Sequence, residues 1–496
     1  SKHQINSFNT FLNVNISKII RQFNPIVIFK GEDKDNNNLY KYKYEIIIGS
    51  SKPAENQDED TDDGKGIFFE YPNYDNKLLY PNKARLKNLS YRSLIKVNIL
   101  IKYWVRTENG NYKCEKKKFY EKIHLGLIPI MTQSNICALG YDKQKNLIEK
   151  GECEYDMGGY FIIDGKEKVI IAQERQIENK LYINKLLNDK NILIKSEIRS
   201  SPEIKIQPAR ITEFYFLKKT KTIRVKIPKI NKEIPIFVLF RALGINSDFD
   251  ICQTIINLNN EINYNNQSMI AVKFLEILEP SVREGAFIKN RFDAWKFLIY
   301  NMSTTFSNAG NTLTSTINQK KIIFMTEILR NYFIPHLGDN LIKKSYYLGN
   351  VINKIILNYL NINPDTDRDS YMFKRVDSSG MLYSLIFRDL YFRVKNKLEE
   401  ELNKSYIKFS QDENFNYKNL ISENENENSI SVQNLIDLKI MNEGFLYAFK
   451  NCWGLKNTRT GACKQGIVQD LDRLSYYGTI SHIRRINTPL SDSSKV

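Results

Sequence analysis

The sequence predicts a mixed α+β protein that folds into more than one domain. Alternation of apolar and polar residues, typical of strands, dominates the early part, and helical spacing dominates beyond about residue 235. The 496 residues exceed what a single hydrophobic core usually serves, so two or three structural units are expected. A composition with 42% hydrophobic and 26% charged residues is that of a folded protein, which excludes wholesale disorder.

Strand patterns are clearest in three places. Apolar and polar residues alternate from Ile95 to Tyr103, which predicts a half-buried strand. The pair Asp164-Gly165 lies between two apolar runs and predicts a two-residue hairpin turn, because such turns need positive φ at both central residues. The segments 211–217 (ITEFYFL) and 222–227 (TIRVKI) predict a further pair of strands.

The later part of the chain carries two apolar stripes at helical spacing. Both predict core-facing helices. Segments 58–66 and 423–429 are polar and lack periodicity, so they predict exposed loops. The stripes consist of Leu348, Ile352, Ile355, Ile356, Tyr359 and Leu360, and of Leu382, Ile386, Leu390, Val394, Leu398 and Leu402.

The charge balance favours a partner that carries phosphates. Lys and Arg number 73 against 56 Asp and Glu, a net charge of +17, although a merely soluble basic protein would look the same. Six cysteines form no CxxC pair, so we predict no metal site. Without a signal peptide or an apolar run of about 18 residues, the protein is expected to be soluble and intracellular.

Six stretches resemble one protein family, and they occur in that family's order. The family is the second-largest, beta-like subunit of the multisubunit DNA-directed RNA polymerases of eukaryotes, archaea and giant viruses. The stretches are YPNKARLKNLSY (80–91), IPIMTQSNICAL (128–139), ECEYDMGGYFIIDGKEKVIIAQER (152–175), IPIFVLFRALGI (234–245), DRDSYMFKRVDSSG (367–380) and GIVQDLDRLSYYGTISHIRRINTPL (466–490).

The resemblance implies a multidomain layout of a strand-rich protrusion, an inserted lobe and a helical fork. On this sequence the protrusion would occupy 1–186 and return at 377–452, the lobe would occupy 187–376, and a truncated fork would occupy 453–496. Because the chain starts with Ser and the family's later segments do not follow, we expect a piece of a longer protein. An expression fragment, a partial gene, an intein or an intron would each explain the ending.

The resemblance also implies the function. As the N-terminal part of that subunit, the chain would shape the polymerase cleft and contact DNA and the RNA–DNA hybrid during DNA-templated transcription. The assembled enzyme is a nucleotidyltransferase, whose Mg²⁺ the largest subunit holds, while Zn²⁺ is expected only in the C-terminal part that is missing here. This chain alone would carry no cofactor and no catalytic residue. Its partners would be the largest and smaller polymerase subunits.

One alternative from another class is a stand-alone basic nucleic-acid-binding or regulatory protein derived from that subunit. The source also remains open. Asn-rich, AT-biased residue usage resembles giant DNA viruses of the mimivirus type, which would place the protein in a cytoplasmic virus factory and the virion. An AT-rich protist polymerase would place it in the nucleus.

The segment from Arg459 onward mixes cations with neutral hydrogen-bonding groups and is the predicted nucleic-acid contact. The resemblance places three of its residues, Gln469, His482 and Arg485, at the start of the RNA–DNA hybrid. Alternatively, Arg484 and Arg485 pair with Asp470 or Asp472, and His482 is a satisfied structural histidine. The predicted nucleic-acid-binding residues are Arg459, Lys464, Gln469, Arg473, His482, Arg484, Arg485 and Lys495.

A second charged segment predicts a structural ion-pair network that ties the lobe to the protrusion. Solvent-facing cations that contact duplex DNA or partner subunits are the alternative. The network would consist of Asp367, Asp369, Lys374, Arg375 and Asp377.

Three details limit what the resemblance carries over. Gln133 stands where the family commonly has Arg, which puts a phosphate contact there in doubt. In the stretch 491–495 only Lys495 matches the family. Gly158 and Gly159 precede a hairpin and no phosphate-loop motif follows, so they are predicted turn residues.

Overall fold

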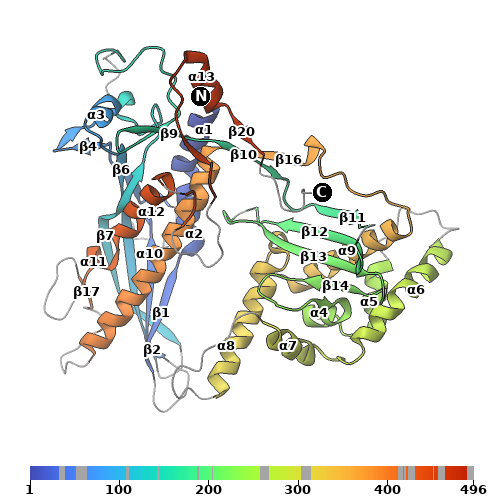
Figure 1. Cartoon of the computed structure of the whole chain (residues 1–496). Coiled ribbons are helices and arrows are strands. Elements are labelled where there is room, and N and C mark those ends of the chain that lie inside the picture. The colour runs from blue at the N-terminus through green and yellow to red at the C-terminus, as the bar shows by residue number, and fades with distance from the viewer. Residues whose placement is uncertain are drawn as a thin grey trace. The chain divides into compact units, whose positions relative to one another are not determined.

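The chain forms two compact units, which the computed structural model in Figure 1 shows as a ribbon. The first unit is Ser1–Arg175 with Val376–Val496, and the second is Gln176–Arg375. Helices and strands occur in both units, which confirms the α+β prediction. The structure describes residues 1–32, 40–51, 64–107, 111–141, 146–186, 189–203, 205–256, 267–302, 314–410, 417, 420–422, 430–450, 452–455 and 464–488.

The first unit is built on a five-stranded antiparallel sheet. Its order is β1-β2-β6-β3, and β7 pairs with β6 over a long antiparallel ladder. The predicted strand from Ile95 to Tyr103 lies in β6 and is confirmed. The strands are β1 (Ile26–Glu32), β2 (Tyr40–Ile48), β3 (Ile67–Phe69), β6 (Arg92–Arg106) and β7 (Tyr112–Pro129).

Strand β6 is more buried than its alternating pattern predicts. Of the three polar members of the pattern, Lys96 is partly buried, while Asn98 and Lys102 are both only 6% exposed. Asn98 is satisfied because its side-chain oxygen accepts the Lys122 N–H at 3.0 Å and its backbone bonds to Gly49 and Gly66. The middle of the strand is therefore buried on both faces, where the backbone of the neighbouring strand β7 supplies a partner for the Asn98 side chain.

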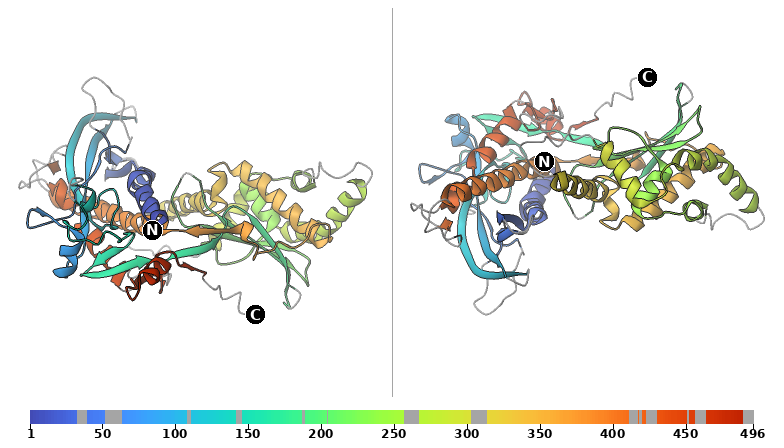
Figure 2. Two further views of the ribbon diagram at one scale, coloured as in Figure 1. Left: turned by 90° about the horizontal axis from the view of Figure 1, so that it is seen from above. Right: turned by 90° about the horizontal axis from the view of Figure 1, so that it is seen from below.

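Helices pack on one side of this sheet, as Figure 2 shows for the dark-blue N-terminal helices and the orange α10. A ring cluster holds them together: Tyr383 of α10 lies within 4.7–5.8 Å of the rings of Phe8, Phe11, Phe161 and Phe445. The apolar stripe from Leu382 to Leu402 is buried, as predicted. The helices are α1 (Lys2–Thr10), the π-helical turn η1 (Phe11–Asn15), α2 (Ile16–Phe23), α10 (Ser379–Phe409), α11 (Val432–Leu435) and α12 (Leu438–Lys450).

The predicted hairpin at Asp164-Gly165 is present. It joins β8 to β9, and φ is 49° at Asp164 and 77° at Gly165, as a type I′ turn needs. Gly158 and Gly159 also have positive φ, 61° and 87°, which agrees with the turn prediction.

Short elements complete the first unit. Strand β19 pairs with β9, and β20 pairs with β10. The elements are β4 (Asn73–Tyr74), β5 (Lys77–Leu78), α3 (Pro81–Leu86), η2 (Ala138–Gly140), β8 (Phe161–Ile163), β9 (Lys166–Ile170), β10 (Ala172–Gln176), β16 (Lys374–Asp377), β17 (Ile421–Ser422), β18 (Ile430–Ser431), β19 (Val468–Asp470), α13 (Tyr476–Ile483) and β20 (Ile486–Asn487).

The second unit has its own sheet, with the strands in sequence order and antiparallel. The predicted strand pair 211–217 and 222–227 lies in β13 and β14, and helices begin at Ile236. The sheet and helices share a core that includes most of the predicted stripe of α9. The strands are β11 (Leu181–Lys185), β12 (Ile192–Ser200), β13 (Arg210–Leu217), β14 (Ile223–Lys226) and β15 (Ile234–Pro235).

The compact second unit starts at Gln176, earlier than the predicted lobe boundary at 187, because β11 pairs with β12. The names protrusion, lobe and fork stay predictions for these units.

The remaining elements of the second unit are α4 (Ile236–Leu243), α5 (Asp248–Ile256), α6 (Gln267–Gly285), α7 (Arg291–Tyr300), α8 (Thr314–Glu327), the π-helical turn η3 (Ile328–Tyr332), η4 (Pro335–Leu337), α9 (Leu341–Tyr359) and η5 (Tyr371–Phe373).

Candidate nucleic-acid interface

The predicted nucleic-acid segment folds as strand β19, a short loop, helix α13 and strand β20. Helix α13 starts at a favourable cap, because the Ser475 hydroxyl accepts the Gly478 N–H at 2.9 Å. Six of the eight predicted residues lie in this segment or directly before it. Arg459 and Lys495 lie outside the described residues.

His482 is a buried, fully hydrogen-bonded histidine. Its Nδ1 accepts the Asp472 backbone N–H at 3.1 Å, so the proton lies on Nε2, which donates to Gln469 Oε1 at 2.9 Å. Burial, and then the charge of Arg485, lower the pKa of His482, while Asp472 opposes them. This geometry matches the structural alternative for His482, whose role is to fix Gln469 and the end of α13.

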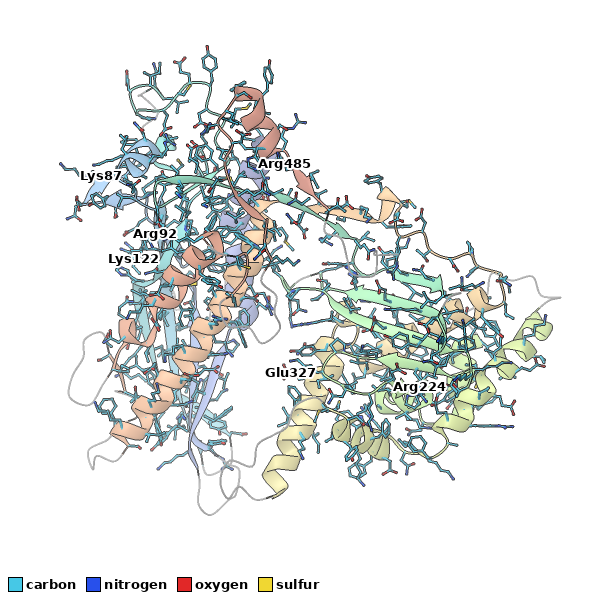
Figure 3. All side chains as sticks on the ribbon, viewed as in Figure 1. Lys87, Arg92, Lys122, Arg224, Glu327 and Arg485 are labelled. Atoms are coloured by element: carbon cyan, nitrogen blue, oxygen red, sulfur yellow. The ribbon has the colours of Figure 1, made fainter. Side chains whose placement is uncertain are left out.

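Arg484 and Arg485 are exposed at the end of α13, where Figure 3 shows Arg485. The two aspartates named in the structural alternative have other partners, because Asp470 pairs with Lys168 at 2.5 Å and Asp472 accepts the Leu474 N–H at 2.9 Å. Within the described residues, neither arginine forms an ion pair, and Arg485 reaches only Gln469 Oε1, at 3.5 Å. Both guanidinium groups are therefore available to an anionic partner.

Arg473, in contrast, is held by carboxylates. It donates to Glu167 through Nε and Nη2 at 2.7 and 3.0 Å and lies 3.6 Å from Asp156. Its guanidinium also covers the Tyr160 ring at 4.9 Å. Although burial alone would lower it, hydrogen bonds and the charge of Glu167 raise the pKa of Arg473. The geometry makes Arg473 an exposed member of a carboxylate–arginine network.

A second arginine completes this network. Arg85 of α3 donates to Glu167 and to the Tyr160 hydroxyl, both at 3.1 Å, and pairs with the buried Glu152. A cavity of about 270 Å³ lies beside the network and is lined by these side chains together with residues of α13. Sequence reasoning missed Arg85 and Glu167 as partners of the segment, because a separation of 306 residues between Arg473 and Glu167 leaves no local pattern.

Lys464 and the residues of the second charged segment contact mainly local partners. Lys464 is exposed and exchanges backbone hydrogen bonds with Trp453 at 3.0 and 3.1 Å. Asp377 pairs with Arg175 at 2.8 Å, and Arg375 donates to the backbone carbonyls of residues 372 and 374.

The acidic residues of that segment also have local partners. The Asp367 carboxylate accepts the Asp369 N–H at 2.9 Å. Their neighbour Arg368, which was not among the predicted residues, pairs with Glu197 at 3.0 Å. The lobe-to-protrusion network stays a prediction.

Metal-binding clusters and membrane-spanning helices are both absent from the residues that the structure describes. No group of three or more His, Cys, Asp or Glu side chains in this part of the chain could hold a metal ion. No helix there is long and apolar enough to cross a membrane.

A family model described as RNA polymerase beta subunit matches residues 1–426, which is most of the sequence. The chain belongs to this family. The match confirms the resemblance drawn from the motifs. The chain is 30% identical to DNA-directed RNA polymerase II subunit 2 of Arabidopsis thaliana, over all of this chain and 39% of the relative.

Other relatives carry similar names. The RNA polymerase II subunit RPB2 of Encephalitozoon cuniculi is 27% identical over all of this chain and 39% of its own length. The RNA polymerase subunit Rpo2N of Methanothermobacter thermautotrophicus is 25% identical over 99% of this chain and 84% of its own length. The beta-subunit chain thus spans about two fifths of the length of the eukaryotic relatives and most of the archaeal one.

Proposed function

We propose that this chain is the N-terminal part of the second-largest subunit of a DNA-directed RNA polymerase and contacts nucleic-acid backbone during DNA-templated transcription. The observation that carries the proposal is the pair of exposed arginines at the end of α13, Arg484 and Arg485, which have no acidic partner among the described residues. Planar guanidinium groups suit phosphate oxygens. The relatives' names favour this function over a stand-alone regulatory protein.

The rest of the assembly would supply the catalytic chemistry. Under this proposal the largest subunit is the principal partner, holds the catalytic Mg²⁺ and works with smaller subunits, while Zn²⁺ belongs to other parts of the second-largest subunit. The protein would act where its template lies: a virus factory and virion for a giant-virus source, or the nucleus for a cellular one.

The chain alone should therefore not polymerise nucleotides. The measurement is template-dependent incorporation of labelled nucleotides by purified residues 1–496 with Mg²⁺. Synthesis that persists after contaminating polymerases are removed would overturn this part of the proposal.

The arginine contact is tested in the assembled enzyme by Arg485→Ala. A charge-assisted hydrogen bond is worth about 1.5 to 3 kcal/mol, so elongation complexes should dissociate about ten-fold to a hundred-fold faster, and less so as salt rises. The loss should not depend on template sequence, because phosphate contacts carry no base information.

Lys439→Ala is the matched control, since Lys439 is an exposed cation on α12 of the same unit. It should leave the complex lifetime unchanged. An unchanged lifetime for Arg485→Ala at low salt, or instability on one template sequence only, would contradict the proposed contact.

A further inference from the structure

A groove of about 720 Å³ lies on the second unit between α7 and α8. The two helices follow one another in the chain and pack together (Figure 1). The groove volume lies within the range of about 300 to 1,000 Å³ that is usual for ligand sites. Its walls come from both helices: Arg291, Phe292, Trp295, Lys296, Ile299, Lys321 and Ile322.

The floor of the groove is apolar and firmly held. Helix α7 directs Ala294 and Leu298 into the core, so its next row, Trp295 and Ile299, lies half-buried along the groove. Trp295 is fixed because its indole N–H donates to the Ala242 carbonyl at 2.9 Å. The floor is therefore a preformed surface, which lowers the entropic cost of binding a partner.

The rim exposes large apolar side chains beside the floor. Phe292 is 66% exposed and Ile322 is 42% exposed. Exposed apolar side chains that line one groove in this way mark an interaction site more often than scattered single residues do.

Three cations surround the apolar floor. Arg291 lies over the Trp295 ring at 5.7 Å, and Lys296 lies over the Phe292 ring at 4.3 Å. Lys321 lines the opposite wall. The nearby carboxylate of Asp293 pairs with Lys296 only loosely, at 3.7 Å between two exposed groups. The rim thus carries net positive charge.

We propose that this groove binds an acidic amphipathic helix of a partner protein. Apolar residues of the helix at i, i+4 and i+7 would fill the floor, and its carboxylates would meet the cations of the rim. A nucleic acid fits less well, because Arg291 and Lys296 already lie over the Trp295 and Phe292 rings and occupy one face on which a base would stack. The aliphatic side chains of Ile299 on the floor and Ile322 on the rim also suit an apolar helix face.

The test selects a displayed library of helical peptides on the full chain, with the Phe292→Asp chain as the counter-selection. The expected pool is rich in Asp and Glu with apolar residues at helical spacing. A labelled peptide from the pool should bind the Phe292→Asp and Ile322→Asp chains about ten-fold more weakly or worse. The double variant Lys296→Glu with Lys321→Glu should also bind the selected peptide more weakly. It should instead bind a version of the peptide whose acidic residues are replaced by Lys.

The neighbouring Ile323 supplies a matched control, because it is 67% exposed on α8 and does not line the groove. Ile323→Asp should bind the peptide as the wild type does, and so should Lys354→Glu, which changes an exposed cation of α9. Absence of an enriched pool, equal enrichment of basic peptides, or equal binding by the Phe292→Asp chain would overturn the proposal. If the Phe292→Asp chain also lost binding to duplex or single-stranded DNA, the groove would be assigned to nucleic acid instead.

Discussion

Arg473 donates through two nitrogens to Glu167, whereas the only described acceptor that Arg485 reaches is Gln469, at 3.5 Å. Arg473 and Arg485 thus lie in the same segment but differ in the partners that they can bind. Glu167 already occupies the Nε and Nη2 groups of Arg473, so a phosphate contact through these groups would cost the two hydrogen bonds to that carboxylate. The presence of a carboxylate partner therefore distinguishes Arg473 from Arg485. The hydrogen bonds of His482 fix the end of α13, where Arg485 lies.

At the same scale, His482 should titrate below its ordinary value of 6.5, since burial and then Arg485 lower its pKa. The unfolded chain then binds the proton more tightly than the folded one. This contribution to stability is present above about pH 6.5 and is lost as the pH falls through that region. The measurement is an NMR titration of ¹³C-labelled histidines, with His482→Gln to assign the resonance.

Arg485→Ala provides the control for that titration, because removal of the nearby cation should raise the midpoint of His482. Ring resonances with a midpoint at or above 6.5 in the wild type would contradict the buried, neutral histidine.

At the scale of elements, one lysine fastens helix α9 to the π-helical turn η3. The ammonium of Lys344 is fully buried and donates to the carbonyls of residues 329, 330 and 333 at 2.8, 2.7 and 2.7 Å. These carbonyls belong to a turn whose end leaves backbone acceptors without helical partners. The ammonium of Lys344 thus supplies hydrogen bonds to backbone carbonyls that lack helical partners, which explains why a charged group is buried in an otherwise apolar core.

Replacement of that lysine, Lys344→Met, should lower the free energy of unfolding of the second unit by about 2 to 4 kcal/mol, because buried carbonyls lose their donor. Burial lowers the pKa of Lys344 to about 8 from 10.5. The folded chain then releases this proton before the unfolded chain does, so wild-type stability should rise with pH between about 8 and 10.5, and the variant should lose that rise.

Denaturant unfolding followed by Trp295 fluorescence measures both effects, in a chain whose Trp104 and Trp453 are replaced by Phe. Lys343→Met, the exposed neighbour on α9, is the matched control and should change stability little. Equal stability of the two variants would mean that water, not Lys344, can satisfy the turn.

At the scale of the whole molecule, each unit has a core of its own. The second unit packs its sheet and helices around one apolar cluster, and the first unit centres on the rings around Tyr383. The first unit also closes on itself where its chain leaves and returns, because Arg175 pairs with Asp377 at 2.8 Å. A discontinuous unit whose ends lie this close tolerates a change of the inserted segment.

Residues 176–375 should therefore be replaceable by a short Gly-Ser linker. Hydrogen exchange should show unchanged protection of β6 and α10 in the shortened chain, since their contacts lie within the first unit. The second unit expressed alone should protect β12, β13 and α9. Loss of protection throughout the shortened chain would show that the two units share one folding core.

Local patterns in the sequence predicted several elements, and the six motifs predicted the family. Alternation predicted β6, helical stripes predicted α9 and α10, and Asp164-Gly165 predicted its hairpin, because these signals act between residues close in the chain. Which of the predicted arginines has a carboxylate partner follows from the tertiary structure. The partner of Arg473, Glu167, lies 306 residues away. The pairing of β19 with β9 brings the two side chains together, and such a long-range contact leaves no pattern in the sequence. The α7–α8 groove likewise depends on which helix face the core covers.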